Sequence, residues 1–142
     1  MERFQIDKRL EDDSTIITTL DLCQVRLHHN AAFPWILLIP MQNNLKEIID
    51  LSDTYQHQLL KEIAIASKVI QRLYNPTKLN VANLGNMVQQ LHIHVIARYD
   101  NDKAWPNPIW NSGVTDTYQA QYLDETLKNL YDAFVFARYH PQ

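Results

Sequence analysis

The chain has 142 residues, of which 46% are hydrophobic and 20% are charged, and its formal net charge is −3. This length suits one domain, and we expect a single domain over residues 1–142. The composition is that of an ordinary water-soluble globule. The net charge gives no electrostatic reason to expect binding to nucleic acid or to an anionic membrane.

The location of the protein can also be anticipated. A lone cysteine, Cys23, cannot form an intramolecular disulfide, which fits a reducing compartment. The N-terminal stretch MERFQIDKRLEDD has no apolar core, so we expect no signal peptide. No apolar run approaches the roughly 18 residues of a membrane-spanning helix. We therefore expect a cytoplasmic protein without a membrane segment.

Two strands are expected in the first part of the chain. The segment 22–29, LCQVRLHH, alternates apolar and polar side chains like a half-buried strand. The segment 34–40, PWILLIP, is a short apolar run with a proline at each end. That pattern predicts a buried central strand, paired with the first.

A long helix should follow, because Ser52 is a good N-cap and apolar residues recur at helical spacing as far as Tyr74. The expected apolar stripe is Tyr55, Leu59, Ile63, Ala66, Ile70 and Leu73.

Two more strands and a second helix complete the prediction. One strand should end near Asn83, and a turn over 84–86 should lead into a strand over 88–97. Gly85 and Gly113 are the only glycines, and each is a candidate turn position. The C-terminal helix is expected over about 117–138. This order predicts an α+β fold with the helices on one face of the sheet.

The stretch QQLHIHVIAR contains the most informative pattern. Side chains of a strand alternate between faces, so Gln90, His92 and His94 should lie in one row, about 6.6 Å apart. Leu91 and Ile93 should point to the other face, toward a core. A polar row on a rigid strand is a suitable support for a binding or catalytic site.

Three interpretations fit this row. A His-x-His pair can bind a metal ion, although no further ligand stands at a short spacing from it. The histidines can instead be half-buried structural groups, hydrogen-bonded to nearby backbone. Finally, a neutral imidazole is a competent nucleophile near pH 7, and its attack on a phosphate ester or anhydride would form a phosphoramidate that water can cleave.

The third interpretation gains weight from a resemblance. QLHIHVI resembles the His-φ-His-φ-His-φ-φ signature of the histidine triad (HIT) superfamily of nucleotide hydrolases and transferases, where φ is apolar. FPWILLIP, EIIDLS and the long helix are similar to the family's strand–proline–helix segment. The resemblance covers residues 22–98. LNVANLGNMVQQLHIHVIAR followed by AWPNPIW is similar to short bacterial members. It implies an antiparallel sheet with one long central helix and a C-terminal helix.

The resemblance also implies roles for the residues of the row. His92 matches the middle histidine of the signature and would be the nucleophile that becomes nucleotidylated. His94 matches the last histidine and would bind the phosphate or the leaving group. Gln90 stands where the first histidine is expected, and its amide can donate a hydrogen bond but cannot carry a proton at pH 7.

Further residues would surround the phosphates and the ribose. The turn around Gly85 matches the family's phosphate-binding turn. Asn86 matches a glutamine position there, and Met87 replaces a serine or threonine hydroxyl. Asn80 lies near an asparagine of the family's phosphate pocket, and Asn30 lies near an acidic residue that the family uses on the ribose.

Several residues outside the motif are open to two interpretations. Arg98 shares the face of His92 and would neutralise phosphate charge; alternatively it is a solvated arginine at the strand end. Trp105 and Trp110 lie in a loop that we expect to border the site. His28 and His29 face opposite ways on the first strand. One of them could approach the pocket; the alternative is that neither has a functional role.

The expected ligand is a purine nucleotide, as the resemblance implies, and apolar walls such as Leu22, Val25 or Leu27 would surround its base. No cofactor or metal ion is required, and the resemblance implies a homodimer. We therefore expect hydrolysis of a nucleotidyl phosphoramidate or phosphoanhydride through a nucleotidyl-histidine intermediate. A nucleotide-binding protein with weak or no catalysis is the alternative, and a metal-binding domain is a more remote one.

Overall fold

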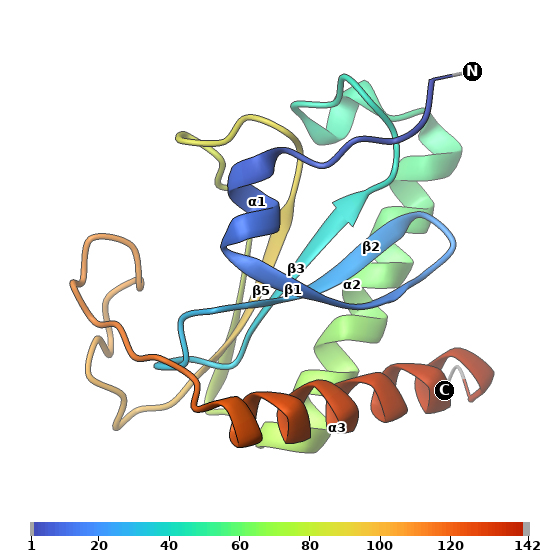
Figure 1. Ribbon diagram of the computed structural model, residues 1–142. Coiled ribbons are helices and arrows are strands. Elements are labelled where there is room, and N and C mark those ends of the chain that lie inside the picture. Colours follow the sequence, from blue (N-terminus) through green and yellow to red (C-terminus); the bar gives the residue numbers. More distant parts are fainter. Residues whose placement is uncertain (1, 141–142) are drawn as a thin grey trace.

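The computed structural model describes residues 2–140 and contains a five-stranded antiparallel sheet with the strand order β1-β2-β3-β5-β4 (Figure 1). The α+β class, the long central helix and the C-terminal helix are as predicted. In chain order the elements are α1 (Lys8–Asp12), β1 (Ser14–Thr19), β2 (Cys23–His28), β3 (Trp35–Pro40), the 3-10 helix η1 (Ile48–Asp50), α2 (Asp53–Tyr74), β4 (Lys78–Ala82), β5 (Ile93–Arg98) and α3 (Ala120–Tyr139).

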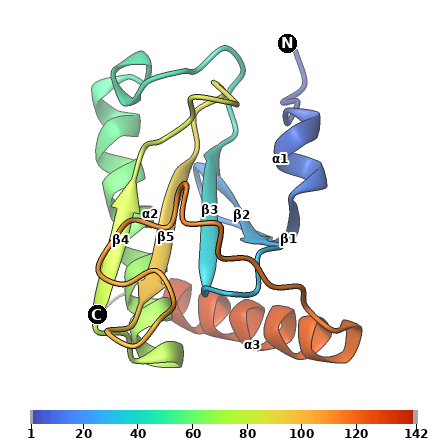
Figure 2. The same cartoon turned by 90° about the vertical axis from the view of Figure 1, so that its left-hand side faces the viewer.

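The two faces of the sheet are covered by different parts of the chain. Helices α2 and α3 pack on one face, over a core that includes Ile36 and Val95. Helix α1 and the loop 99–119 cover the other face, where Leu37 and Ile96 are buried. In Figure 2 this loop crosses in front of β3 and β5, and α2 lies behind them. The prediction that the helices share one face is therefore confirmed for the two long helices but not for α1.

Strand β3 is the central strand, as its apolar sequence predicted. All six of its residues are buried, and it pairs with β2 on one side and β5 on the other. A strand buried on both faces needs apolar side chains at consecutive positions, which explains why WILLIP does not alternate.

The sequence interpretation missed α1 and β1. In β1 the pairing with β2 shifts between Ile16 and Thr18, which is the signature of a β-bulge. A bulge adds one residue to a strand and interrupts the alternation from which strands are recognised. Helix α1 has only five residues and begins after the N-cap Asp7, so it is too short to produce a helical apolar pattern.

Strand β5 begins at Ile93, five residues later than predicted. Residues 83–92 form turns and irregular backbone instead, and Leu91 bonds through its amide to the carbonyl of Leu45. Of the predicted polar row, only His94 lies within the strand. His92 directly precedes it, and Gln90 belongs to the irregular segment.

Helix α2 has the predicted boundaries. The hydroxyl of Ser52 accepts a hydrogen bond from the amide of Tyr55, and Asn75 ends the helix in a left-handed conformation with φ 45°. In the middle of the predicted stripe Leu59, Ala66 and Ile70 are buried and Ile63 is half-buried, but Tyr55 and Leu73 at its two ends are exposed. The buried face also contains an unpredicted carboxylate, Glu62, which is 0% exposed.

That carboxylate joins α2 to the start of β2. Its two oxygens accept hydrogen bonds from the backbone amides of Leu22 and Cys23, both at 2.8 Å. A buried charge is tolerated when it is fully hydrogen-bonded, so Glu62 is an anchor for the β1–β2 turn. Within residues 2–140, no helix has the length and apolar character needed to cross a membrane.

Candidate active site

Three neighbouring strands bring aromatic and histidine side chains together on the face away from α2 and α3. His28 comes from β2, Trp35 from β3 and His94 from β5. The ring of His28 stacks on Trp35 at 3.6 Å between centroids, and the ring of Trp35 lies 5.6 Å from that of His94. The His92 ring follows at 4.8 Å from His94. The sheet and the residue directly before β5 thus bring three histidines together, two of which were predicted for the site.

His92 is oriented by the backbone of its own segment. Its Nδ1 atom lies 2.7 Å from the carbonyl oxygen of Gln90. Because a carbonyl can only accept, Nδ1 carries the proton in this contact, and Nε2 of the neutral ring keeps its lone pair. Burial lowers the pKa of His92, although the bond to Gln90 and the nearby Asp7 carboxylate oppose this change. The ring is therefore neutral near pH 7, with a nucleophilic nitrogen.

His94 has hydrogen-bonding partners on both ring nitrogens. The indole N–H of Trp35 donates to Nδ1 at 3.0 Å, and Nε2 lies 2.8 Å from the carbonyl oxygen of Leu84. The ring therefore carries its proton on Nε2 and donates it to Leu84. Burial lowers the pKa of His94 to about 4. His94 is a neutral group that connects β3 to the start of the turn before Gly85.

The backbone at Gly85 packs closely against the ring of His92. A Cβ atom at this position would lie 2.5 Å from the carbonyl oxygen of Val88 and 3.1 Å from Cε1 of His92. Glycine is required here for space, whereas Gly113 has the left-handed φ of 72° expected of a turn glycine. The predicted importance of Gly85 is consistent with this contact.

A groove of about 360 Å³ lies beside this turn. Its lining residues are Lys46, Glu47, Asn83, Gly85, Asn86, Gln89 and Gln90. The structure therefore brings the predicted Gly85 and Asn86 into one groove, together with Lys46 and Asn83, which sequence reasoning missed. Asn83 directly follows β4, and a polar residue at a strand end is a signal that could have identified it. Lys46 lies in the loop between β3 and η1, where the sequence pattern gives no such signal.

The side chain of Gln90 is occupied by the N-terminal segment. Its oxygen accepts a hydrogen bond from the amide of Asp7 at 2.7 Å, and its nitrogen donates to the carbonyl of Gln5 at 2.9 Å. Arg9 strengthens the same junction by donating to the carbonyl of Met87. In this arrangement Gln90 fixes residues 5–9 beside the histidines, and only its backbone carbonyl contacts His92.

Arg98 forms hydrogen bonds with Asp102 and with Asn80. Arg98 is 1% exposed and makes two hydrogen bonds to Asp102, at 2.8 and 3.0 Å, while its third contact is the side-chain oxygen of Asn80 at 3.0 Å. The interpretation of Arg98 as a solvated strand-end residue is thus wrong. Its predicted contact with phosphate also has no support in this geometry, because Asp102 neutralises its charge. The pKa of Asp102 is lowered to about 2, chiefly by the hydrogen bond from Arg98.

Asn30 holds the loop that covers the histidines. Its amide nitrogen donates to the carbonyl of Val114, and its oxygen accepts from the amides of Ala32 and Asp116. Its predicted contact with a ribose therefore corresponds here to a structural contact within the protein. The predicted position of the loop is supported, since the ring of Trp110 stands edge-on to His94 at 5.0 Å.

The predicted apolar walls of the base pocket need correction. Leu22, Val25 and Leu27 are buried in the core beneath α2 and α3. Alternation along β2 explains this, because Val25 and Leu27 point to the helix-covered face while His28 points to the other. These leucines and the valine are core residues, away from the histidines.

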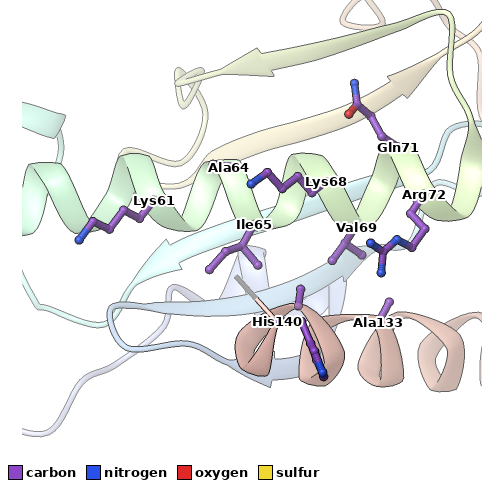
Figure 3. Close-up of a pocket in the computed structure, with 10 residues that line it drawn as sticks. Lys61, Ala64, Ile65, Lys68, Val69, Gln71, Arg72, Ala133 and His140 are labelled. Atoms are coloured by element: carbon purple, nitrogen blue, oxygen red, sulfur yellow. The ribbon is translucent and has the colours of Figure 1, made fainter. Parts of the chain in front are cut away.

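A second hollow is separate from the histidines. It measures about 850 Å³ and lies between α2 and α3, where Ile65, Val69 and Ala133 contribute to its lining (Figure 3). Because both helices cover the opposite face of the sheet, this hollow is not part of the histidine site. Within residues 2–140, no group of three or more histidine, cysteine or carboxylate side chains is arranged to hold a metal ion.

Comparisons with known proteins agree with this geometry. The chain matches the family model of the HIT domain over residues 9–101. Among solved structures, a histidine triad protein from Bradyrhizobium japonicum is 35% identical with a TM-score of 0.90, and the match covers 94% of this chain and 99% of that one. One from Marinobacter aquaeolei is 34% identical with a TM-score of 0.90, covering 94% and 97%.

A third histidine triad protein, from Sinorhizobium meliloti, is 34% identical with a TM-score of 0.88, and the match covers 92% of this chain and 96% of that one. A comparison with curated proteins finds no match for the chain. The chain therefore belongs to the histidine triad (HIT) family, and this membership supports a nucleotide-binding or hydrolase-type function in general terms.

Proposed function

We propose that the protein hydrolyses a nucleotidyl bond in two steps through a nucleotidyl-His92 intermediate. The observation that supports this proposal most directly is the contact of 2.7 Å between Nδ1 of His92 and the carbonyl of Gln90. It leaves Nε2 as the basic nitrogen of a neutral, largely buried ring, which is the form of histidine that attacks phosphorus.

In the first step Nε2 of His92 forms a bond to the phosphorus of the nucleotide, and the bond from phosphorus to the leaving group breaks. The leaving group departs with that electron pair. The ring then carries a positive charge, which the Gln90 carbonyl stabilises by accepting a hydrogen bond from Nδ1–H. In the second step water attacks phosphorus and releases one proton to the solvent, the phosphorus–nitrogen bond breaks, and its electron pair returns to Nε2.

The groove beside Gly85 is the proposed position of the phosphates. Lys46 supplies a positive charge, and Asn83 and Asn86 supply amide donors along its wall. His94 and Gln90 then serve as positioning residues. His94 supports the backbone before Gly85, and the carbonyl of Gln90 orients His92. The proposed ligand is a purine nucleotide without a further cofactor, and we also propose a cytoplasmic homodimer.

The alternative proposal is a nucleotide-binding protein with weak or no catalysis. Two features of residues 87–90 favour it. The side chain of Gln90 is hydrogen-bonded to the N-terminal segment, and Met87, where a hydroxyl was expected, is 84% exposed. Binding of a nucleoside monophosphate without turnover would support it.

The test is release of nucleoside monophosphate from adenosine and guanosine phosphoramidates, dinucleoside polyphosphates and nucleotide sugars. Wild type is compared with His92→Asn, which keeps a polar side chain but removes the nucleophile. We expect turnover by wild type and its loss in the variant. Equal turnover by both proteins would refute the role of His92. Monophosphate binding without turnover by either would select the alternative.

A further inference from the structure

The side chains near His92 differ in whether they can supply a proton to a leaving group. The inference drawn from this rests on the proposed function. We propose that Trp35 and Leu84 lock His94 as a neutral positioning group, so that the site has no general acid and cleaves best those nucleotidyl bonds whose leaving group departs as an anion. By the lock we mean that these two contacts hold the His94 ring in its neutral form. The leaving-group preference follows from it.

The lock follows from two hydrogen bonds of opposite direction. Nδ1 of His94 accepts the indole N–H of Trp35 at 3.0 Å, and Nε2–H donates to the carbonyl of Leu84 at 2.8 Å. An indole N–H can only donate, so protonation of Nδ1 would place two N–H groups against each other. His94 therefore cannot take up a proton without losing its bond to Trp35.

Trp35 is itself held in place. The ring of His28 stacks on it with an interplanar angle of 4°, and the ring of Trp110 stands edge-on to it at 6.3 Å. Nδ1 of His28 accepts the backbone N–H of Asn30 at 3.0 Å, which fixes the His28 ring in turn. The indole N–H is thus aimed at His94 by a buried stack on β2 and β3.

The other titratable groups near His92 also lack an available proton. Burial lowers the pKa of His28 to about 4, so this ring is neutral near pH 7. The hydrogen bond from the Arg9 guanidinium lowers the pKa of Asp7, which is therefore ionised. Gln90 cannot donate a proton at all. Of His28, His94, Asp7 and Gln90, none therefore offers a proton near pH 7.

The lack of a proton donor beside His92 has a chemical consequence for the leaving group. A positioned general acid typically accelerates departure of a basic leaving group by about 10²–10⁴-fold. Without one, the oxygen that leaves phosphorus must carry its negative charge into solvent. Phosphate and polyphosphate groups leave readily as anions near pH 7, whereas an alcohol or an amine, which would have to leave as an alkoxide or an amide anion, does not.

The first experiment measures kcat/KM for a series of aryl esters of adenosine monophosphate, from nitrophenyl to unsubstituted phenyl, at pH 7. We expect wild type to lose at least about 100-fold in kcat/KM across the series. A rate that is the same for all esters would reveal a general acid and overturn the leaving-group inference while leaving the proposed function intact. No turnover of the nitrophenyl ester would refute the proposed function as well.

The second experiment tests the lock without any turnover. Nitrogen-15 NMR of the His94 ring is recorded between pH 4 and 8 in wild type, Trp35→Phe and Trp110→Phe. Both variants remove an indole N–H near His94 and keep an aromatic ring, but only Trp35 donates to His94. We expect Trp35→Phe alone to raise the pKa of His94 toward the ordinary value. An unchanged titration in Trp35→Phe would overturn the lock.

Discussion

Nδ1 of His92 lies 2.7 Å from the backbone carbonyl oxygen of Gln90, two residues earlier in the chain. Any residue at position 90 can supply this carbonyl, so the replacement of the expected histidine by glutamine leaves the orientation of the His92 ring intact. What the glutamine changes is its side chain, which joins the N-terminal segment through Gln5 and Asp7.

This division of roles predicts the behaviour of Gln90→Ala. The variant loses two hydrogen bonds to the N-terminal segment, so its free energy of unfolding should fall by about 1–2 kcal/mol. The carbonyl that orients His92 remains, and nucleotide turnover should fall less than about tenfold. Urea unfolding and kcat/KM measure the two effects. A loss of turnover as large as in His92→Asn would assign a direct catalytic role to the glutamine side chain.

Gly85→Ala should impair the site without unfolding the protein. The added methyl group would meet the backbone carbonyl of Val88 at 2.5 Å, so the turn must shift away from His92. We expect nucleoside monophosphate affinity to fall at least about tenfold, with little change in the far-ultraviolet circular dichroism spectrum. Calorimetric titration measures the affinity. Gly113→Ala is the control, because it strains a turn elsewhere and has open space around it. Equal affinity losses in both variants would argue against the Gly85 contact.

Acid pH should destabilise the protein below the ordinary histidine pKa. His28 and His94 have folded pKa values of about 4, against 6.5 for the unfolded chain, so only the unfolded state gains these protons between pH 6.5 and 4. The free energy of unfolding should therefore fall as the pH drops through this window and level off below about 4 with respect to these two groups.

Urea midpoints measured from pH 7.5 to 4.5 check this dependence. His28→Phe, which keeps an aromatic ring against Trp35, should give a shallower slope because one titrating group is gone. The Asp102 carboxyl does not interfere, since its contribution is lost only as the pH falls from 3.8 toward about 2. A midpoint that is independent of pH between 6.5 and 4.5 would contradict the neutral state of the two rings.

Asp102→Asn separates the two interpretations of Arg98. Removing the carboxylate leaves a buried, uncompensated guanidinium, which should lower the free energy of unfolding by about 3–5 kcal/mol. Apparent affinity for a nucleoside monophosphate should not rise in the folded fraction. An increase in phosphate affinity would instead indicate that Asp102 normally competes with phosphate for Arg98. Thermal unfolding and calorimetric titration give the two results.

Glu62→Gln should destabilise the fold while leaving the histidine site unchanged. One carboxylate oxygen becomes an NH₂ group facing the backbone N–H of Leu22 or Cys23, so one buried donor loses its acceptor. The expected cost is roughly 2–3 kcal/mol of unfolding free energy. The exposed Glu125→Gln, on α3, is the matched control and should change the stability little. Similar free energies of unfolding in both variants would show that the buried hydrogen bonds of Glu62 do not stabilise the fold.

The sequence predicted the parts of the fold that follow from local periodicity. β3 is uniformly apolar, α2 has a capping serine and a helical stripe, and both were located correctly. The bulged strand β1 was missed because the extra residue disrupts alternation. The late start of β5 was missed because the apolar residues before Ile93 continue an alternating pattern although their backbone is irregular.

The candidate site was predictable where one short motif defines it, and less so where distant segments meet. His92, His94 and Gly85 lie within ten residues and were identified together. The contacts of His28 and Trp35 with this group depend on strand order, which a linear pattern does not give. The contact between Arg98 and Asn80 was equally hidden, because it joins two strands, whereas Asp102 lies only four residues after Arg98.

The most direct test of the nucleotidyl-His92 intermediate is its capture. A single turnover with a nucleotide substrate is stopped without acid, which would cleave the phosphorus–nitrogen bond, and the intact protein and its peptides are weighed by mass spectrometry. We predict a transient mass increase of one nucleotidyl group on the peptide containing His92, absent in His92→Asn. Full turnover with no adduct on His92, or with the adduct on another residue, would contradict the proposed mechanism.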